Sequence, residues 1–318
     1  MGHKPARNDP YQIVTDCILG HLERGVVPWH YPWNRASGCP RNFQTGRAYQ
    51  GVNVLLLSLQ RRPSRWWLTF RQTRERGGSV RKGEHGAIVI KWGTQKRSLK
   101  NGDGSEENKT VYFLKAYHVF NAVQIEGVEF PPETDIVHID ESQRIARADE
   151  IVAKMPDPPA IHEGRFTQAF YRYATDTIDM PPFARFRSPA DFHLSRFHEL
   201  VHSTGHEKRV GRKGITEGDG FRGKKYSFEE LIAEMGAAFL GAEAGIDCDG
   251  QSQSSAYIKS WLDVLKAPDH RRWIVQAANQ AAKAVDFILA RGNDENPAVP
   301  VESQGEGETQ ERLFPTAS

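Results

Sequence analysis

Apolar residues recur every three or four positions in several stretches of the chain, a spacing that places them on one face of an α-helix. In residues 10–24 this pattern follows the pair Asp9-Pro10, which can cap a helix, and Gly25 can end it. Two more such stretches lie near the C-terminal end. The apolar positions are Tyr11, Val14, Ile18 and Leu22, then Tyr257, Trp261 and Leu265, then Ile274, Ala277, Ala281, Val285 and Ile288.

Strand signals lie between these helices. Runs of β-branched and aromatic residues predict strands over 87–92 and 111–120, and the polar segment 93–110 between them is typical of an extended hairpin loop. Further on, the pattern predicts a helix near 141–155, a strand near 160–162 and a hairpin or edge strand in 169–180. Helices and strands in this order indicate an α+β protein.

The chain divides at a Pro-containing connection whose clearest mark is Pro131-Pro132. Its 318 residues are enough for two domains of ordinary size. We expect a small α/β domain over residues 1–130 and a second domain over 136–292. Residues 293–318 are polar, acidic and poor in apolar side chains, so we expect them to be disordered.

The clearest chemical motif is His198-Glu199-Leu200-Val201-His202. In a helix the two histidines lie one turn apart on one face and can reach one metal ion, with Glu199 beside them as a general base. This is the H-E-x-x-H arrangement of zinc metallopeptidases. Ser188-Pro189 and an acid at Asp191 predict a capping box in front of the helix. A core helix that carries histidines is the structural alternative.

A catalytic zinc site needs a third protein ligand. Glu230 and Glu234 are one turn apart in residues 227–234, so one can bind the metal while the other orients a histidine. We favour Glu230 as the ligand. Ser227 and Glu230 also match a capping box, which would leave Glu234 as the ligand instead, and Glu229 is expected to be a solvated acid.

The net charge of +2 hides an uneven distribution. Residues 1–130 hold 20 Lys and Arg against 10 Asp and Glu, whereas the remaining residues hold 22 against 30. Between Arg24 and Lys91, thirteen basic residues accompany two acidic ones and, counting Trp92, five tryptophans. Cations mixed with flat rings favour binding of single-stranded nucleic acid. The alternative is a domain whose tryptophans are core and whose arginines are solvated.

Three scattered cysteines without C-x-x-C spacing favour reduced thiols in a cytoplasmic protein. No apolar run is long enough to cross a membrane, and the first residues lack an apolar secretion signal. We therefore expect a cytoplasmic protein without membrane contact.

Several further motifs carry a resemblance to a known family. The motifs are Val26-Val27-Pro28-Trp29, Pro32-Trp33, residues 45–53 around Arg47, Trp67-Leu68-Thr69-Phe70-Arg71-Gln72, Val80-Arg81-Lys82-Gly83-Glu84, Val119-Phe120-Asn121, residues 197–206 and residues 229–234. With these motifs in this order, the chain resembles the ArdC-type antirestriction proteins of conjugative plasmids, and its N-terminal part is similar to TraC-type plasmid primases.

The resemblance implies a single-stranded-DNA-binding domain joined to a zincin-like metallopeptidase domain, which together protect incoming plasmid DNA from host restriction. His198, His202 and the Glu230 region match the metal site, which would hold Zn²⁺ or another divalent ion such as Mn²⁺, and Glu199 matches the catalytic glutamate. The expected partners are single-stranded DNA and a protein of the host restriction machinery. The expected DNA contacts are Trp29, Trp33, Arg47, Trp67, Arg71, Arg81 and Lys82.

Two alternatives to a peptidase stay open. One is a DNA-binding shield whose metal site is only structural, and the other is a nucleic-acid-processing metalloenzyme. A peptidase also needs a group that stabilises the oxyanion, for which Tyr171, His206 and Tyr226 are candidates. The segment from Gly205 to Tyr226 is rich in glycine and cations, and is either a cover over the site or a surface loop.

Overall fold

The computed structural model describes residues 9–30, 38–100, 106–132, 140–212, 224–246 and 255–291, with the side chains of 94–100, 106–112 and 224–226 left aside. Its helices and strands confirm the α+β prediction. Among the described residues, no helix combines the length and apolar character that crossing a bilayer requires. Trp33 and the predicted disordered tail lie outside the described residues.

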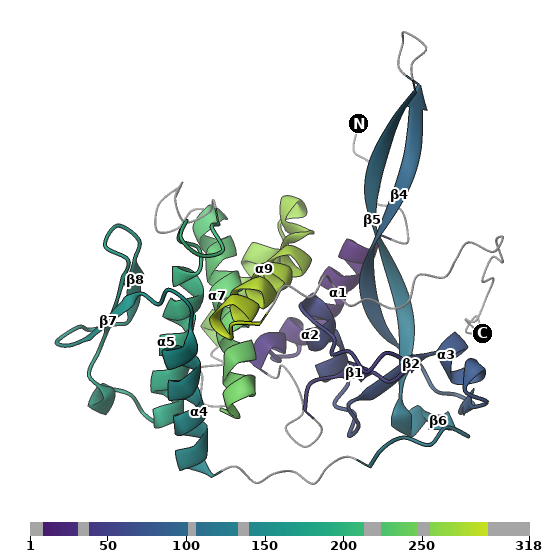
Figure 1. The fold of residues 1–318 in the computed structure, drawn as a ribbon, viewed down its shortest axis with the longest axis horizontal. Coiled ribbons are helices and arrows are strands. Elements are labelled where there is room, and N and C mark those ends of the chain that lie inside the picture. The colour runs from purple at the N-terminus through teal and green to yellow at the C-terminus, as the bar shows by residue number, and fades with distance from the viewer. Residues whose placement is uncertain are drawn as a thin grey trace.

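The N-terminal half contains a mixed sheet flanked by short helices (Figure 1). The sheet has the order β1-β2-β5-β4, in which β1 is parallel to β2 and the other neighbours are antiparallel. A separate pair, β3 and β6, is antiparallel. The elements are α1 (Pro10–Glu23), η1 (Pro28–His30), β1 (Arg41–Asn42), α2 (Val52–Ser58), β2 (Trp66–Thr69), α3 (Phe70–Glu75), β3 (Ser79–Val80), β4 (Ala87–Lys100), β5 (Glu106–Asn121), η2 (Ala122–Gln124) and β6 (Ile125–Glu126).

The predicted hairpin loop at 93–110 is wrong for most of its length. Strands β4 and β5 continue past it as a twisted two-stranded ribbon that projects from the sheet (Figure 1). The two strands stay paired from Ala87 opposite Val119 to Lys100 opposite Glu106. Backbone pairing holds a two-stranded ribbon together and requires no alternation of apolar and polar residues, which explains why its polar sequence resembled a loop.

The C-terminal half is a helical layer with a small sheet at its edge (Figure 1). The sheet has the order β7-β9-β8, with β7 parallel and β8 antiparallel to β9, so the predicted hairpin at 169–180 is confirmed and β8 is an edge strand. The elements are α4 (Glu141–Lys154), β7 (Ala160–Glu163), β8 (Phe170–Arg172), β9 (Thr177–Met180), η3 (Phe183–Arg185), α5 (Pro189–Ser203), α7 (Lys224–Ala244), α8 (Ser255–Leu265), η4 (Pro268–His270) and α9 (Trp273–Ile288).

The two halves share one hydrophobic core. Buried residues of α1, α2 and η1 belong to the same contiguous cluster as those of α5, α7 and α9. The two halves approach closely at the junction, because a Cβ atom added at Gly51 would lie 2.8 Å from the side-chain Oδ1 of Asn279 and 3.5 Å from the Ala278 carbonyl oxygen. The N-terminal helices therefore pack directly on the helical layer that carries the histidine motif.

Candidate functional site

Helix α5 carries the histidine motif as predicted. Ser188 Oγ accepts a hydrogen bond from the Asp191 N–H at 3.1 Å, which confirms the N-cap, while the Asp191 carboxylate pairs with Arg187 Nε at 2.9 Å. The buried side of α5 faces α7. There a Cβ atom at Gly236 would come within 2.7 Å of Val201 Cγ2, so the glycine permits the close approach of the two helices.

This approach brings three metal-binding side chains together. His198 Nε2 and His202 Nε2 lie 3.0 Å apart, and the Glu230 carboxylate lies 3.5 Å from the first and 3.3 Å from the second. Donors bound tetrahedrally at the usual zinc distances are about 3.3 Å apart, so this set is spaced to hold a divalent ion. Within the described part of the chain, His198, His202 and Glu230 form a group of three side chains whose donor atoms lie close enough together to bind one metal ion.

Glu234 lies one turn farther along α7. It takes part in a hydrogen bond with Tyr257, and burial raises the pKa of its carboxyl above the ordinary value. Its charge interacts electrostatically with His198, whereas the direct contact of that histidine is with Glu230. The geometry therefore places Glu230 among the donors and Glu234 behind them.

The predictions for Ser227 and Glu229 are wrong. Helix α7 begins at Lys224, so Ser227 lies inside the helix and does not cap it. Glu229 is 7 % exposed and is bound by Arg212, whose Nε donates to Glu229 Oε2 at 3.0 Å. The same carboxylate lies 3.4 Å from His202 Nδ1. A carboxylate at the second nitrogen of a ligand histidine fixes the ring and its tautomer.

Both histidines bind protons more strongly than usual. Burial lowers the pKa of each, but hydrogen bonds to glutamates outweigh it: those from Glu229 and Glu230 raise the pKa of His202 to about 10, and Glu230 raises that of His198. Burial opposes ionisation of Glu230, yet both histidines hold the pKa of its carboxyl far below the usual range. The metal-free site is therefore a protonated cluster.

A metal ion must displace these protons, so its affinity is expected to fall as the pH falls. Between pH 8 and pH 6 the Mn²⁺ affinity should drop about tenfold per unit for each proton released, with at least one proton per ion. Calorimetric titrations of Mn²⁺ in buffers with different heats of ionisation give the number of protons directly. An affinity that does not change with pH would contradict the raised histidine pKa values.

Glu199 is held beside this group by a neighbouring strand. Its carboxylate is nearly buried, and Oε2 accepts a hydrogen bond from the Tyr171 backbone N–H of β8 at 2.7 Å. The edge strand therefore fixes the orientation of the predicted general base. Glu199 also lines a cavity next to the metal-binding side chains.

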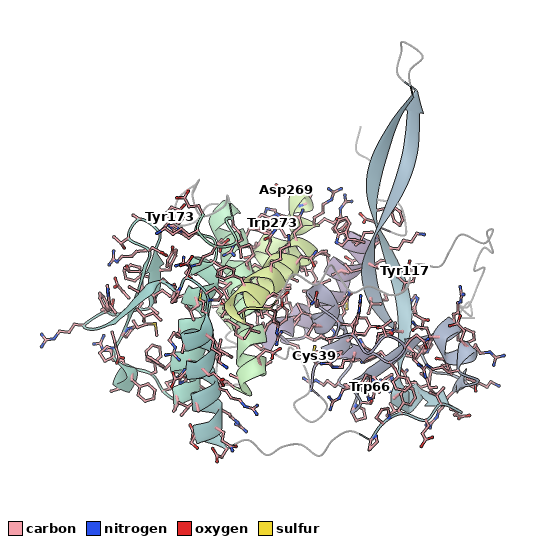
Figure 2. All side chains as sticks on the ribbon, in the orientation of Figure 1. Cys39, Trp66, Tyr117, Tyr173, Asp269 and Trp273 are labelled. Atoms are coloured by element: carbon pink, nitrogen blue, oxygen red, sulfur yellow. The ribbon has the colours of Figure 1, made fainter. Side chains whose placement is uncertain are left out.

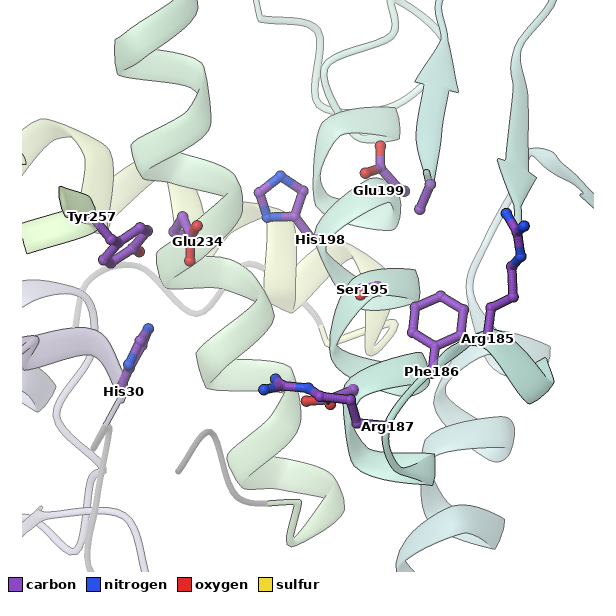
Figure 3. A pocket seen from close by; sticks show the side chains of 11 residues that line it. His30, Arg185, Phe186, Arg187, Ser195, His198, Glu199, Glu234 and Tyr257 are labelled. Atoms are coloured by element: carbon purple, nitrogen blue, oxygen red, sulfur yellow. Dashed lines mark hydrogen bonds and ion pairs between the residues drawn. The ribbon is translucent and has the colours of Figure 1, made fainter. Parts of the chain in front are cut away.

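The cavity has a volume of about 470 Å³ and opens between the two halves of the molecule. Figure 3 shows Ser195, His198 and Glu199 on α5, Arg185 of η3 and Arg187 in the segment before this helix, and His30 and Tyr257 on the other side. The sequence did not identify His30 or Tyr257 as residues of the site. They reach the cavity because segments more than 200 residues apart in the sequence pack together, and a local sequence pattern cannot predict such packing.

Two of the three predicted oxyanion candidates, Tyr171 and His206, do not line this cavity. The Tyr171 hydroxyl donates to Asp176 Oδ1 at 2.8 Å, and the His206 ring packs on Tyr173 with Nδ1 accepting the Lys208 N–H at 3.3 Å. The side chain of Tyr226 lies outside the described ones, as do residues 213–223 of the predicted cover.

Two of the three tryptophans predicted to stack on DNA bases, Trp29 and Trp67, belong to the core. Trp29 is 0 % exposed and packs edge-on against Trp261, and Trp67 is 2 % exposed. A base cannot reach either ring, so the stacking role expected for them is incompatible with this packing. The cationic residues of the prediction are exposed at the surface of the N-terminal half: Arg47, Arg71, Arg81 and Lys82.

A different set of rings reaches the surface of the sheet. Phe43, Trp66 and Phe130 are partly exposed and in contact, with ring centroids 5.4 Å apart for Phe43 and Trp66 and 4.7 Å for Phe43 and Phe130. Arg76 lies over Phe43 and Arg65 over Trp66. We call these five residues the aromatic–arginine surface; Figure 2 labels Trp66 within it.

Family models match both halves of the chain. Residues 8–120 match the N-terminal domain of anti-restriction factor ArdC, and residues 146–280 match a zincin-like metallopeptidase. Among curated proteins, the chain is 31% identical over 297 residues to the uncharacterized protein y4eC of Sinorhizobium fredii, covering 90% of this chain and 93% of that protein. It is 32% identical over 304 residues to DNA primase TraC of Escherichia coli, but covers only 27% of that primase.

Solved structures give the same result. The metal-free crystal structure of the antirestriction protein ArdC from plasmid R388 is 36% identical with a TM-score of 0.69, and the match covers 88% of this chain and 96% of that one. The Mn(II)-bound structure of the same protein is 34% identical with a TM-score of 0.67, covering 90% and 99%. The chain thus belongs to the ArdC antirestriction family, with an ArdC N-terminal domain followed by a zincin-like domain.

Proposed function

We propose that this protein binds single-stranded DNA and hydrolyses a peptide bond with a divalent metal, and that it thereby protects incoming plasmid DNA from restriction in the recipient cytoplasm. The observation that carries the proposal is the group of His198, His202 and Glu230 with Glu199 fixed beside it at the wall of a cavity. Zn²⁺ is the proposed ion, with Mn²⁺ as the alternative that the R388 relative binds. The proposed domains are residues 1–130 and 136–292.

The proposed reaction is hydrolysis. His198, His202 and Glu230 would hold the metal, which would supply Lewis-acid chemistry by making a water molecule more acidic and polarising a carbonyl group. Glu199 takes the proton from the attacking water and passes it to the leaving nitrogen, while the Tyr171 N–H keeps its carboxylate in position. Glu229 and Arg212 hold the His202 ring.

The proposed DNA site is the aromatic–arginine surface. Partly exposed rings give stacking platforms for unpaired bases, and the guanidinium groups above them meet the phosphate backbone. Exposed Arg47 and Arg71 belong to the neighbouring turn and to α3, and they extend the positive charge around this surface. The relation to TraC primase supports a nucleic-acid ligand for this domain.

Adjacent tryptophans give a matched test of this surface. Trp66→Ala is expected to weaken binding of a fluorescent dT oligonucleotide by about 1–3 kcal/mol through lost stacking, with little change in stability. Trp67→Ala removes a buried ring and should lower the free energy of unfolding by about 3–5 kcal/mol. Anisotropy titrations at fixed salt and urea unfolding separate the two effects. Normal DNA binding by a folded Trp66→Ala protein would exclude this surface.

The cellular function is tested by plasmid transfer. Transfer of an unmodified plasmid into restricting and non-restricting recipients is compared with and without this protein. We expect the protein to raise transfer into the restricting recipient alone. An equal effect, or none, in both recipients would contradict protection from restriction.

A further inference from the structure

Arg185 is an exposed cation at the wall of the proposed peptidase cavity. It is the last residue of η3 and lines the cavity together with His198 and Glu199. Figure 3 shows Arg185 and Phe186 on one side of these two residues and Tyr257 on the other. A ligand that enters the cavity beside the metal-binding side chains therefore meets a positive charge on one side.

Packing and a hydrogen bond hold Arg185 in this place. Its neighbours Phe183 and Phe186 both pack edge-on against Phe192 of α5, with ring centroids 5.1 Å and 5.2 Å from the Phe192 centroid. The Arg185 guanidinium group donates through Nη1 to the Phe166 carbonyl oxygen at 3.2 Å. Phe166 belongs to the segment between β7 and β8, so this bond ties the arginine to the approach of the strand that fixes the general base.

Arg185 has no ion-pair partner among the described residues. Its printed bond goes to a neutral carbonyl group, and no described carboxylate lies within ion-pair distance of the guanidinium. Arginines elsewhere in this half of the molecule are paired with acids: Arg172 with Asp179, Arg187 with Asp191, Arg196 with Asp149, Arg209 with Asp176 and Arg212 with Glu229. Arg187 also lines the cavity, but Asp191 already balances its charge. Arg185 thus leaves an uncompensated positive charge at the wall.

The chemistry of this position suits a carboxylate. A guanidinium group has several N–H donors in one plane, and two of them can form parallel hydrogen bonds to the oxygens of one carboxylate. Such a pair is stronger in a protein cavity than in bulk water, because the effective dielectric constant is lower. Phe186 also lines the cavity and gives apolar surface for the methylene groups of a ligand side chain.

We propose that Arg185 selects peptides that carry a carboxylate close to the scissile bond, so that the peptidase prefers anionic segments of its protein substrate. The inference rests on the proposed peptidase function and adds the chemical class of the substrate. The carboxylate belongs to an acidic side chain or to the C-terminus of the substrate, and the experiment distinguishes the two. Removing the charge of Arg185 should weaken binding of anionic peptides and leave neutral peptides and the metal unaffected.

Peptides anchored on the metal by a hydroxamate test this contact without requiring turnover. Acetyl-glutamyl-leucine hydroxamate and its glutaminyl analogue extend from the metal on the N-terminal side of a substrate. Hydroxamoylacetyl-leucyl-glutamic acid α-amide and the corresponding glutamine amide extend on the C-terminal side. Hydroxamoylacetyl-leucyl-glutamine, as the free acid, carries a C-terminal carboxylate alone. Binding to the Mn²⁺-loaded full-length protein is followed by water-proton relaxation.

We expect the wild type to bind at least one carboxylate probe about tenfold more tightly than its neutral analogue. The probe that shows this preference identifies the carboxylate as that of a side chain or of the C-terminus. In Arg185→Met and Arg185→Gln the preference should fall to less than about twofold, while the affinities for the neutral probes and for Mn²⁺ stay at the wild-type level. Glutamine can still donate to the Phe166 carbonyl, so Arg185→Gln decides the matter if Arg185→Met unfolds.

Arg165→Met is the matched control. Arg165 is also an exposed arginine, lies in the same segment before β8 as Phe166, and does not line the cavity. Its replacement removes one positive charge from the same region of the surface. The preference for the carboxylate probe should stay at the wild-type level in this variant, which separates a contact of Arg185 from a general effect of charge.

Three results would overturn the proposal: equal binding of acidic and neutral probes by the wild type, a preference that persists in both Arg185 variants, or binding of no probe by the wild type. Peptidase activity is scored separately, by mass spectrometry of a synthetic peptide library incubated with the wild type. A wild type that binds carboxylate probes through Arg185 but cuts no peptide would refute the proposed function and leave the Arg185 contact established. Cleavage without any preference for acidic peptides would support the function and refute the role of Arg185.

Discussion

Glu199→Gln is expected to lower the rate of peptide cleavage by about 10²- to 10⁴-fold, the contribution of a general base. Glutamine has nearly the same shape and can still accept the Tyr171 N–H, but it cannot take a proton from water. Because Glu199 is not among the three metal-binding side chains, Mn²⁺ and DNA affinities should not change. The loss is measured by incubating the wild type and the variant with a library of synthetic peptides and quantifying the cleaved products by mass spectrometry.

The same variant separates catalysis from shielding in cells. If protection in the restricting recipient is lost with Glu199→Gln, hydrolysis is part of the function. If protection survives in a variant that still binds metal and DNA, the protein acts as a DNA shield and the metal domain is structural. Glu163→Gln is the matched control, since Glu163 Oε1 also accepts a backbone N–H, from Phe183 at 2.9 Å, without lining the cavity.

Arg212→Met is expected to lower the free energy of unfolding of the metal-free protein by about 3–5 kcal/mol. The guanidinium group is buried and donates to Glu229, and it also donates to the Val201 carbonyl at 2.7 Å. Methionine at position 212 cannot donate these hydrogen bonds, so the buried Glu229 carboxylate loses its main partner. Because Glu229 then no longer fixes His202, Mn²⁺ affinity should fall about 10- to 100-fold.

Urea unfolding and Mn²⁺ titration measure the two effects. Lys154→Met removes an exposed ion pair with Glu150 and should leave both quantities unchanged. The double variant Arg212→Met/Glu229→Leu should recover much of the stability, because it removes the uncompensated charge, but not the metal affinity. Normal metal affinity in a folded Arg212→Met protein would mean that Arg212 does not position the site.

The histidines of the site could be predicted from the sequence because their geometry is local. A serine cap, a proline at the first turn and a four-residue spacing place His198 and His202 on one face of a helix. The role of Glu229 could not be predicted in this way. It depends on where α7 begins, which is Lys224, three residues before the expected cap. It also depends on the buried Arg212, which lies before α7 in the sequence and donates a hydrogen bond to Glu229.

The burial of the tryptophans could not be predicted from the sequence either, because it depends on long-range packing. Composition indicated rings among cations, but which ring is exposed depends on what covers it. Trp29 is covered by Trp261, more than 200 positions away in the chain. Trp66 and Trp67 alternate across β2, and a shift of one position exchanges the exposed ring with the buried one.

The shared core also bears on how such proteins diversify. The match to TraC primase covers 88% of this chain but only 27% of the primase, so both halves occur side by side inside a much longer polypeptide. Because the helices of one half bury apolar surface of the other, recombination that separates them would expose this surface to water and destabilise both halves. We therefore expect gene rearrangement to transfer the two halves together, as one inheritable module.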